Sequence, residues 1–157
     1  MPEFDLSSPL LAVATAFTTG FALAILPVGL AEVAAVAIGM VRPPGLALAM
    51  LAAFTVAHVA AKVPWYFLGR AADRARTPRV QSFVTRAREL VARYPRYGVG
   101  ILALSAVTSI PPFHLAAIAA GIARIPLGRF VLVCLAGRIV RFGLLGMLPS
   151  MARLWLG

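Results

Sequence analysis

Several ionisable side chains stand inside segments that are otherwise apolar, and they are the groups that could do chemistry. They are Glu32, His58, Lys62, His114, Arg138 and Arg141. A charged side chain at the centre of a bilayer costs at least about 2.5–3.5 kcal/mol on insertion scales. We therefore expect these groups to face the protein interior and to pair with one another. His58 and Lys62, four residues apart, fall on one face of a helix.

The pairing that we expect joins Glu32 to Arg138 or Arg141, with His114 nearby. A carboxylate, a guanidinium and an imidazole in a wet cavity can hold a phosphate head group or pass a proton. The alternative is a buried ion pair that only holds helices together, with His114 packed as a core residue. We expect Lys62 to extend to the cytoplasmic interface.

The same residues give no indication of an enzyme. The sequence has no nucleophile–base pair, no cluster of metal ligands and no glycine-rich phosphate loop, and its two histidines lie far apart. The single cysteine, Cys134, stands in an apolar run and is expected to be a small buried hydrophobic residue. We therefore expect no enzymatic activity, no cofactor and no metal.

The composition is that of an integral membrane protein. The chain is 61% hydrophobic and 13% charged, with a mean hydropathy of +0.92, whereas a soluble domain is about half apolar and a quarter charged. Its 157 residues leave room for a single membrane domain, residues 1–157. The beginning of the chain carries Glu3 and Asp5 in place of a basic signal-peptide region, so we expect the first apolar segment to be retained.

The positive charge is concentrated in one connecting segment. The net charge is +10, and eight of the arginines lie within residues 70–96. Because short arginine-rich loops stay inside, we expect residues 70–97 to be cytoplasmic and to contact anionic lipid head groups rather than nucleic acid. An amphipathic interfacial helix is predicted by the apolar face formed by Val80, Phe83, Val84, Ala87, Leu90 and Val91. The alternative is a solvated basic loop that only fixes the topology.

Part of the chain occurs twice. Residues 32–44 read E-V-A-A-V-A-I-G-M-V-R-P-P, and residues 114–126, 82 positions later, read H-L-A-A-I-A-A-G-I-A-R-I-P. Six of the thirteen positions are identical, and both copies contain G-x-x-R-x-P. Paired segments interrupted by glycine and proline are typical of transporters built from internal repeats, whose site lies at the repeat interface.

The apolar segments predict an all-α membrane fold of two inverted-repeat units. Each unit is a broken re-entrant hairpin followed by a spanning helix: repeat 1 covers about 21–69, the basic connector 70–97, and repeat 2 about 98–148. Segment 28–41 is too short to cross the bilayer, whereas 45–68 and 126–148 are long enough. The expected hairpin breaks are Pro27, Gly39, Pro111, Pro112 and Gly121.

Two further expectations concern the spanning segments. We expect Trp65 and Tyr66 to form an aromatic belt where segment 45–68 reaches the interface. As an alternative to the hairpins, 8–26 and 98–122 could cross as ordinary kinked helices, which would give a four-helix protein.

Three motifs in order resemble one known family. Residues 111–130, P-P-F-H-L-A-A-I-A-A-G-I-A-R-I-P-L-G-R-F, are similar to its second hairpin and the start of the following helix. Residues 65–70, W-Y-F-L-G-R, and Pro27 with Glu32 are similar to two further motifs. Over about residues 21–148 the chain resembles the short form of the DedA / SNARE-associated Golgi protein (VTT-domain) membrane family.

The resemblance implies two facing re-entrant hairpins and translocation of lipids, such as phospholipids or polyprenyl-phosphate carriers, with or without ion coupling. It implies a multi-pass protein of the bacterial inner (plasma) membrane with membrane lipids as partners. Whether the protein forms a homo-oligomer is left open. The family's functional acid corresponds to Glu32. Its second-hairpin arginine has no clear match, with His114 and Arg124 the nearest candidates.

Two other functions remain open from the sequence. The same charged residues would suit a small proton- or ion-coupled transporter of a soluble anion. The second alternative is a membrane protein that does not transport anything and instead recruits a partner or anionic lipid through its basic helix.

Overall fold

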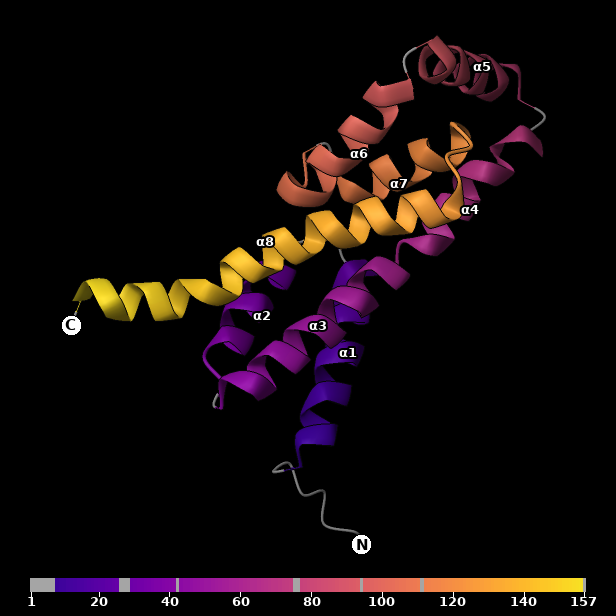
Figure 1. Ribbon diagram of the computed structural model, residues 1–157. Helices are drawn as coiled ribbons and strands as arrows, with labels where there is room; N and C mark the ends of the chain where they lie inside the picture. Colours follow the sequence, from indigo (N-terminus) through magenta and orange to yellow (C-terminus); the bar gives the residue numbers. More distant parts are fainter. Residues whose placement is uncertain are drawn as a thin grey trace, which may run out of the picture. The chain divides into compact units, whose positions relative to one another are not determined.

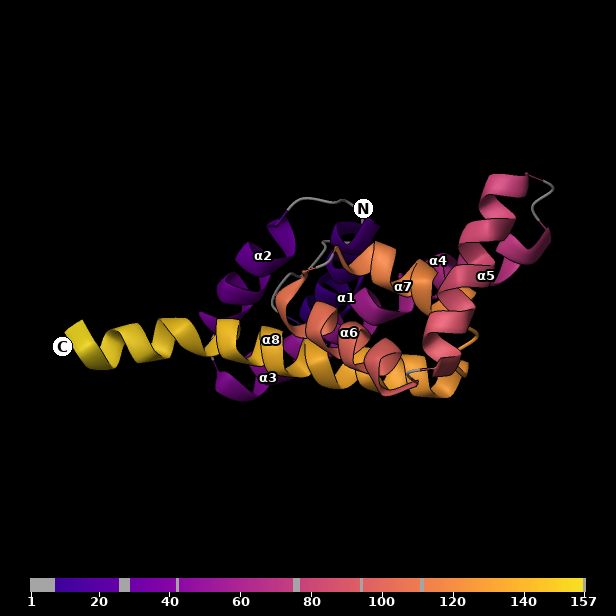
Figure 2. The same cartoon turned by 90° about the horizontal axis from the view of Figure 1, so that it is seen from above.

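The computed structural model describes residues 8–25, 29–41, 43–74, 77–93, 95–110 and 112–156. Within these ranges the regular elements are all helices, as Figure 1 and Figure 2 show, so the predicted all-α class is confirmed. They are α1 (Pro9–Ile25), α2 (Leu30–Gly39), α3 (Pro44–Ala60), α4 (Val63–Ala71), η1 (Ala72–Arg74), α5 (Pro78–Arg93), α6 (Pro95–Thr108), α7 (Phe113–Ile122) and α8 (Leu127–Leu156). Pro27 and Pro111, two of the expected hairpin breaks, lie outside the described residues.

Two helical segments are long and apolar enough to cross a membrane. They are Pro44–Ala71 with 28 residues and Leu127–Ala152 with 26, and about 20 residues suffice for the hydrocarbon core. The first was expected to be continuous, but a turn at Ala61–Lys62 separates α3 from α4. Pro64 explains the turn, because its ring lacks an N–H and clashes with the carbonyl of Ala60.

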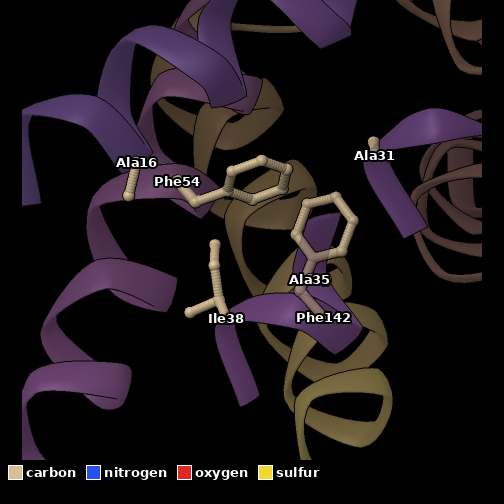
Figure 3. Packing of buried hydrophobic residues seen from close by; sticks show 6 residues of the cluster. All are labelled: Ala16, Ala31, Ala35, Ile38, Phe54 and Phe142. Carbon is tan, nitrogen blue, oxygen red and sulfur yellow. The ribbon is translucent and has the colours of Figure 1, made fainter. Parts of the chain in front are cut away.

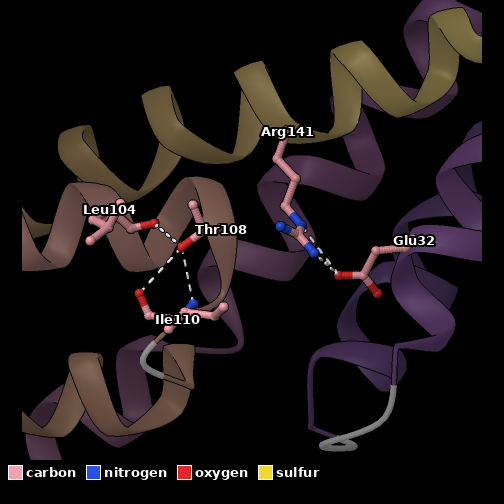
Figure 4. A network of polar contacts seen from close by, with 5 residues as sticks. All are labelled: Glu32, Leu104, Thr108, Ile110 and Arg141. Carbon is pink, nitrogen blue, oxygen red and sulfur yellow. Dashed lines mark hydrogen bonds and ion pairs between the residues drawn. The ribbon is translucent and has the colours of Figure 1, made fainter.

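The other apolar helices are shorter, and they are arranged in the same order in both sequence halves. α1 is followed by the ten-residue α2 and then by α3; α6 is followed by the ten-residue α7 and then by α8. Between α6 and α7, Ser109 has a φ of 62°, which interrupts the helical conformation. The Thr108 hydroxyl donates to the Leu104 carbonyl at 2.8 Å and accepts from the Ile110 N–H at 3.1 Å (Figure 4).

The chain forms two compact units that do not coincide with the two sequence halves. Unit 1 comprises Met1–Ala61 and Ile139–Gly157, and unit 2 comprises Lys62–Arg138. Each boundary falls within one of the two long apolar segments. α1, α2, α3 and the last part of α8 therefore belong to unit 1, and the other elements belong to unit 2.

The core of unit 1 lies where α1 and α2 pack against α3. Figure 3 shows its central residues, which are Ala16, Ala31, Ala35, Ile38, Phe54 and Phe142. The rings of Phe54 and Phe142 meet edge to face with their centroids 5.1 Å apart, a favoured geometry for aromatic pairs. Small residues bring the helices close: a Cβ on Gly20 would approach the Phe54 carbonyl oxygen to 2.6 Å.

In unit 2 the main contact joins α4 to α7. A Cβ on Gly69 would overlap the Ile118 carbonyl oxygen, and one on Gly121 would overlap the Tyr66 carbonyl oxygen. Tyr66 itself is fully buried, and its hydroxyl donates to the Ile125 carbonyl at 2.6 Å. The prediction that Tyr66 belongs to an aromatic belt is therefore wrong, because this close helix contact encloses its side chain.

Repeated glycines fill the same packing role in both halves. Gly39 and Gly121 occupy the same position of the sequence repeat. A Cβ on Gly39 would overlap the Gly146 carbonyl oxygen on α8, just as one on Gly121 would overlap that of Tyr66 on α4. In each unit, the short helix of one sequence half thus packs against the far end of the long segment of the other half.

The basic connector contains the expected helix. α5 (Pro78–Arg93) covers all six positions of the predicted apolar face. Val84, the one member of that face whose side chain is described, is buried, whereas Arg79, Arg86 and Glu89 are exposed. The helix is confirmed, and its position at a membrane surface stays a prediction.

Replacing Gly121 by alanine should lower the melting temperature of the purified protein in detergent, because the new methyl group would overlap the Tyr66 carbonyl oxygen. Overpacking of this kind costs about 1–3 kcal/mol. Gly100 on α6 is the matched control, since a Cβ there meets nothing within 4 Å. Gly100→Ala should keep or raise the melting temperature. An unchanged melting temperature in Gly121→Ala would contradict the close contact.

Candidate functional site

The ion pair expected for Glu32 is present in unit 1, with Arg141 as its partner. The Arg141 Nη2 lies 2.7 Å from the Glu32 Oε1, and its Nε donates to the same oxygen at 3.2 Å (Figure 4). The side chains of Arg141 and Glu32 are 20% and 26% exposed. Two charges that are mostly buried thus compensate each other between α2 and α8.

Local structure explains why the carboxylate lies there. Glu32 is in the first turn of α2, where the partial positive charge of a helix N-terminus favours an acidic group. Gly39 lies seven residues further, about two helical turns, and so on nearly the same face of α2. Since Gly39 packs against Gly146, one face of α2 carries both the backbone contact with α8 and the ion pair with Arg141.

The two carboxylate oxygens of Glu32 are used differently. The Nε and Nη2 groups of Arg141 both donate to Oε1, whereas Oε2 is buried and has no hydrogen-bond partner among the described residues. A buried acceptor without a partner costs about 1–3 kcal/mol. The site therefore has one saturated oxygen and one that can still accept a proton or a hydrogen bond from a bound molecule.

The other two mid-chain cations occupy a separate cluster in unit 2. Arg138 is 3% exposed, and its Cζ lies 4.3 Å from the centre of the Phe113 ring. Lys62 is 5% exposed, with its Nζ 5.9 Å from the same ring centre. The expectation that Lys62 extends to the interface is therefore wrong: it is the N-cap of α4, at the turn before Pro64, and its side chain is buried.

Both histidines pack against aromatic rings. His58 is buried in unit 1, with its ring 6.1 Å from that of Phe54 and 5.2 Å from that of Phe142. His114 is half-buried in unit 2, and its ring lies 5.9 Å from that of Trp65. The turn at Ala61–Lys62 interrupts the helix face that His58 and Lys62 were expected to share. A pathway role for either histidine stays a prediction.

Arg124, the residue after the α7 cap, has an uncommon backbone conformation. Its φ is 55°, the left-handed region that glycine adopts most readily. The Arg124 N–H bonds to the Gly121 carbonyl and the Ile125 N–H to the Ala120 carbonyl, which together form a Schellman cap. The Arg124 side chain is exposed at this turn.

Two further side chains hold the end of α7, and sequence reasoning did not find them. The Arg88 Nε, from α5, donates to the Ile122 carbonyl at 3.0 Å. Arg70 donates through Nη1 to the Tyr66 hydroxyl oxygen at 3.1 Å. A carbonyl at a helix C-terminus attracts cations, but only the fold shows which arginine of the connector reaches it.

In a comparison with protein families, the model of the VTT domain matches residues 7–150. The chain belongs to the VTT-domain family. This is the domain of DedA and SNARE-associated proteins, as the sequence motifs predicted. Searches of curated proteins and of solved structures gave no match.

Family membership and the two long apolar helices make this VTT-domain chain a membrane protein. Its surface agrees, because large apolar side chains along α8 are exposed in both units. They include Leu132, Ile139, Leu144, Met147 and Met151. This number of large exposed apolar side chains on one helix suits contact with lipid or another protein.

The pair of Glu32 and Arg141 should show thermodynamic coupling. Glu32→Gln and Arg141→Gln, made singly and together, should give a coupling energy of about 0.5–3 kcal/mol, because the second substitution removes a charge that the first has already left uncompensated. Denaturant unfolding of the purified protein in detergent measures it. Arg141→Lys, which keeps the charge but loses the planar fork, should destabilise less than Arg141→Gln. Strictly additive effects would show that the pair does not form.

Arg124→Gly should raise the melting temperature, by a gain of about 0.5–1 kcal/mol, because glycine relieves the left-handed backbone and keeps both cap hydrogen bonds. Arg129→Gln is the control, since Arg129 is an exposed arginine on α8 and its replacement removes the same charge. Thermal unfolding in detergent compares the two variants. A fall in melting temperature for Arg124→Gly alone would mean that its side chain contributes more than the backbone strain costs.

Proposed function

We propose that this VTT-domain protein translocates lipids across the bilayer, as a flippase or scramblase for phospholipid or polyprenyl-phosphate head groups. The observation that carries the proposal is the Glu32–Arg141 pair, mostly buried between apolar helices, with the Glu32 Oε2 open. Membership of the VTT-domain family supports the membrane setting.

The ion pair could let a polar head group cross the membrane if the head group replaces Glu32 as the partner of Arg141. The phosphate of a lipid would take the Arg141 donors, because guanidinium binds phosphate as well as carboxylate. Glu32 would then accept a proton or a hydrogen bond from the head group, which also gives a route to ion coupling. If Glu32 takes up a proton as the phosphate binds Arg141, neither residue keeps an uncompensated charge, whereas breaking a buried pair without such exchange costs about 3–5 kcal/mol.

The proposal includes two inverted repeats with re-entrant hairpins in a multi-pass protein of the plasma membrane. α2 and α7 each have ten residues, so each is about 15 Å long and spans only half of the hydrocarbon core. The equivalent contacts of Gly39 and Gly121 support the repeat. The cytoplasmic placement of residues 70–97 rests on the exposed arginines of α5 and its neighbours.

One further function would use the same residues: a transporter of a soluble anion could exchange that anion for Glu32 at Arg141. A second alternative is that α5 recruits a partner protein or anionic lipid. The exposed Arg79 and Arg86 of α5 favour this function. Neither requires an enzymatic activity, a cofactor or a metal.

Reconstituted protein should move a fluorescent phospholipid or a polyprenyl-phosphate probe between leaflets, and Glu32→Gln should reduce that flux at least tenfold, because it removes the exchangeable carboxylate. A dithionite-quenching assay on proteoliposomes measures the flux. Arg141→Gln should have the same effect. Glu89→Gln is the matched control, since Glu89 is exposed on α5, and it should keep wild-type flux.

The result separates the three functions. Uptake of a soluble anion without lipid flux, abolished in Glu32→Gln, would replace the lipid proposal by the anion transporter. Absence of both fluxes from folded wild type, with salt-sensitive binding to anionic vesicles, would favour recruitment.

A further inference from the structure

Unit 1 contains a cavity that the proposed function does not use. Its volume is about 400 Å³, and it lies where the end of α2 and the start of α3 face the last part of α8. All of its lining residues belong to unit 1. The volume is within the range of about 300–1,000 Å³ that small-molecule sites have in proteins.

Missing side chains create this cavity. Gly39, Gly143 and Gly146 all line it. Gly39 and Gly146 bring α2 and α8 together, because a Cβ on Gly39 would overlap the Gly146 carbonyl oxygen. At Gly143, in contrast, a Cβ would meet nothing within 4 Å. The backbone of α8 is therefore in close contact with α2 at Gly146 and faces open space at Gly143.

The lining suits hydrocarbon better than water. Leu48, Leu51 and Met147 contribute large apolar side chains. Ser150 has the one polar side chain among the lining residues, and its hydroxyl donates to the Met147 carbonyl at 2.7 Å. A water molecule in a cavity needs about two to four polar partners, so apolar cavities stay dry. If the cavity were empty, the lining atoms would lose van der Waals contacts.

The depth of the cavity fits one leaflet of a bilayer. Its α3 lining, within 44–51, lies at the start of the apolar segment Pro44–Ala71, and its α8 lining, within 143–150, lies near the end of the segment Leu127–Ala152. At about 1.5 Å of rise per residue, each stretch is about 12 Å long. Half of a hydrocarbon core of about 30 Å is about 15 Å. Along a helix that crosses the membrane, the cavity thus covers a length similar to that of a lipid chain in one leaflet.

Large exposed apolar side chains lie at the mouth of the cavity. Leu48 and Met147, which line it, are 69% and 58% exposed. Leu144, Leu148 and Met151 on α8 are also exposed. In a membrane protein such side chains contact lipid hydrocarbon. A lipid chain therefore reaches the cavity sideways from its own leaflet, without passing through water.

We propose that this cavity binds one acyl chain of a membrane phospholipid, held between the end of α2, the start of α3 and the last part of α8. The dry lining suits hydrocarbon, and the bilayer around a membrane protein supplies it in excess. The site goes beyond the proposed function, because it predicts a bound lipid and not lipid movement. The absence of lipid flux would not affect it.

Photolabelling of the full-length protein in proteoliposomes tests the proposal. The probe is a phosphatidylcholine with a diazirine on one acyl chain, present at low mole fraction, and mass spectrometry locates the labelled residues. We expect the cavity residues Ala47 and Leu51, which are half-buried, to be labelled several times more than Leu132, an exposed residue of α8 in unit 2. Bulk lipid alone would label the exposed residue most.

Two substitutions fill the cavity from different walls. Gly143→Leu places a side chain of α8 in open space, and Ala47→Leu narrows the cavity from α3. Each should lower the label on Leu51 at least tenfold and leave the label on Leu132 unchanged. Gly128→Leu is the matched control, since Gly128 lies on α8 outside the lining and a Cβ there also meets nothing within 4 Å. It should be labelled as wild type.

Three results would overturn the proposal. The first is a wild-type pattern in which Ala47 and Leu51 are labelled no more than Leu132, a result that requires no variant. The second is an unchanged label on Leu51 in folded Gly143→Leu and Ala47→Leu proteins. The third is a lipid-free dimer in native mass spectrometry that Gly143→Leu dissociates, since a second copy of the chain would then occupy the cavity.

Discussion

The backbone contact between short and long helices is the constraint on which the rest of the structure depends. Without side chains at Gly39 and Gly121, the backbones of α2 and α7 lie directly against α8 and α4. An apolar chain in lipid gains little from hydrophobic burial between helices, so this close van der Waals packing must hold the short helices in place. The Glu32–Arg141 ion pair lies at the first of these contacts, and the buried Tyr66 lies at the second.

Charge is the second constraint, and the two units meet it differently. In unit 1 a carboxylate and a guanidinium compensate each other, and one carboxylate oxygen is left open. In unit 2 the side chains of Lys62 and Arg138 both lie near the face of the Phe113 ring. The first arrangement suits exchange of one partner for another.

The sequence predicted the helical membrane class and an arginine as the partner of Glu32. An apolar chain has few charged side chains, and those that are buried must pair with one another. It could not choose between Arg138 and Arg141, which differ by about 60° around the helix; the packing of Gly146 on α2 decides the rotation of α8 in unit 1. Lys62 was misplaced because the effect of Pro64 on a hydrophobic segment depends on its neighbours. Arg88 was missed because a cap contributed by another helix has no local signal.

The hydrogen bond from Arg88 to the Ile122 carbonyl joins α5 to the C-terminal end of α7. A guanidinium can direct the same N–H toward a carbonyl or toward an anion, but not toward both. Any acidic surface that engages this side of α5 therefore competes with the end of α7 for one donor. The stability of the C-terminal end of α7 would then depend on the charge that binds to α5, although the bound group does not contact α7.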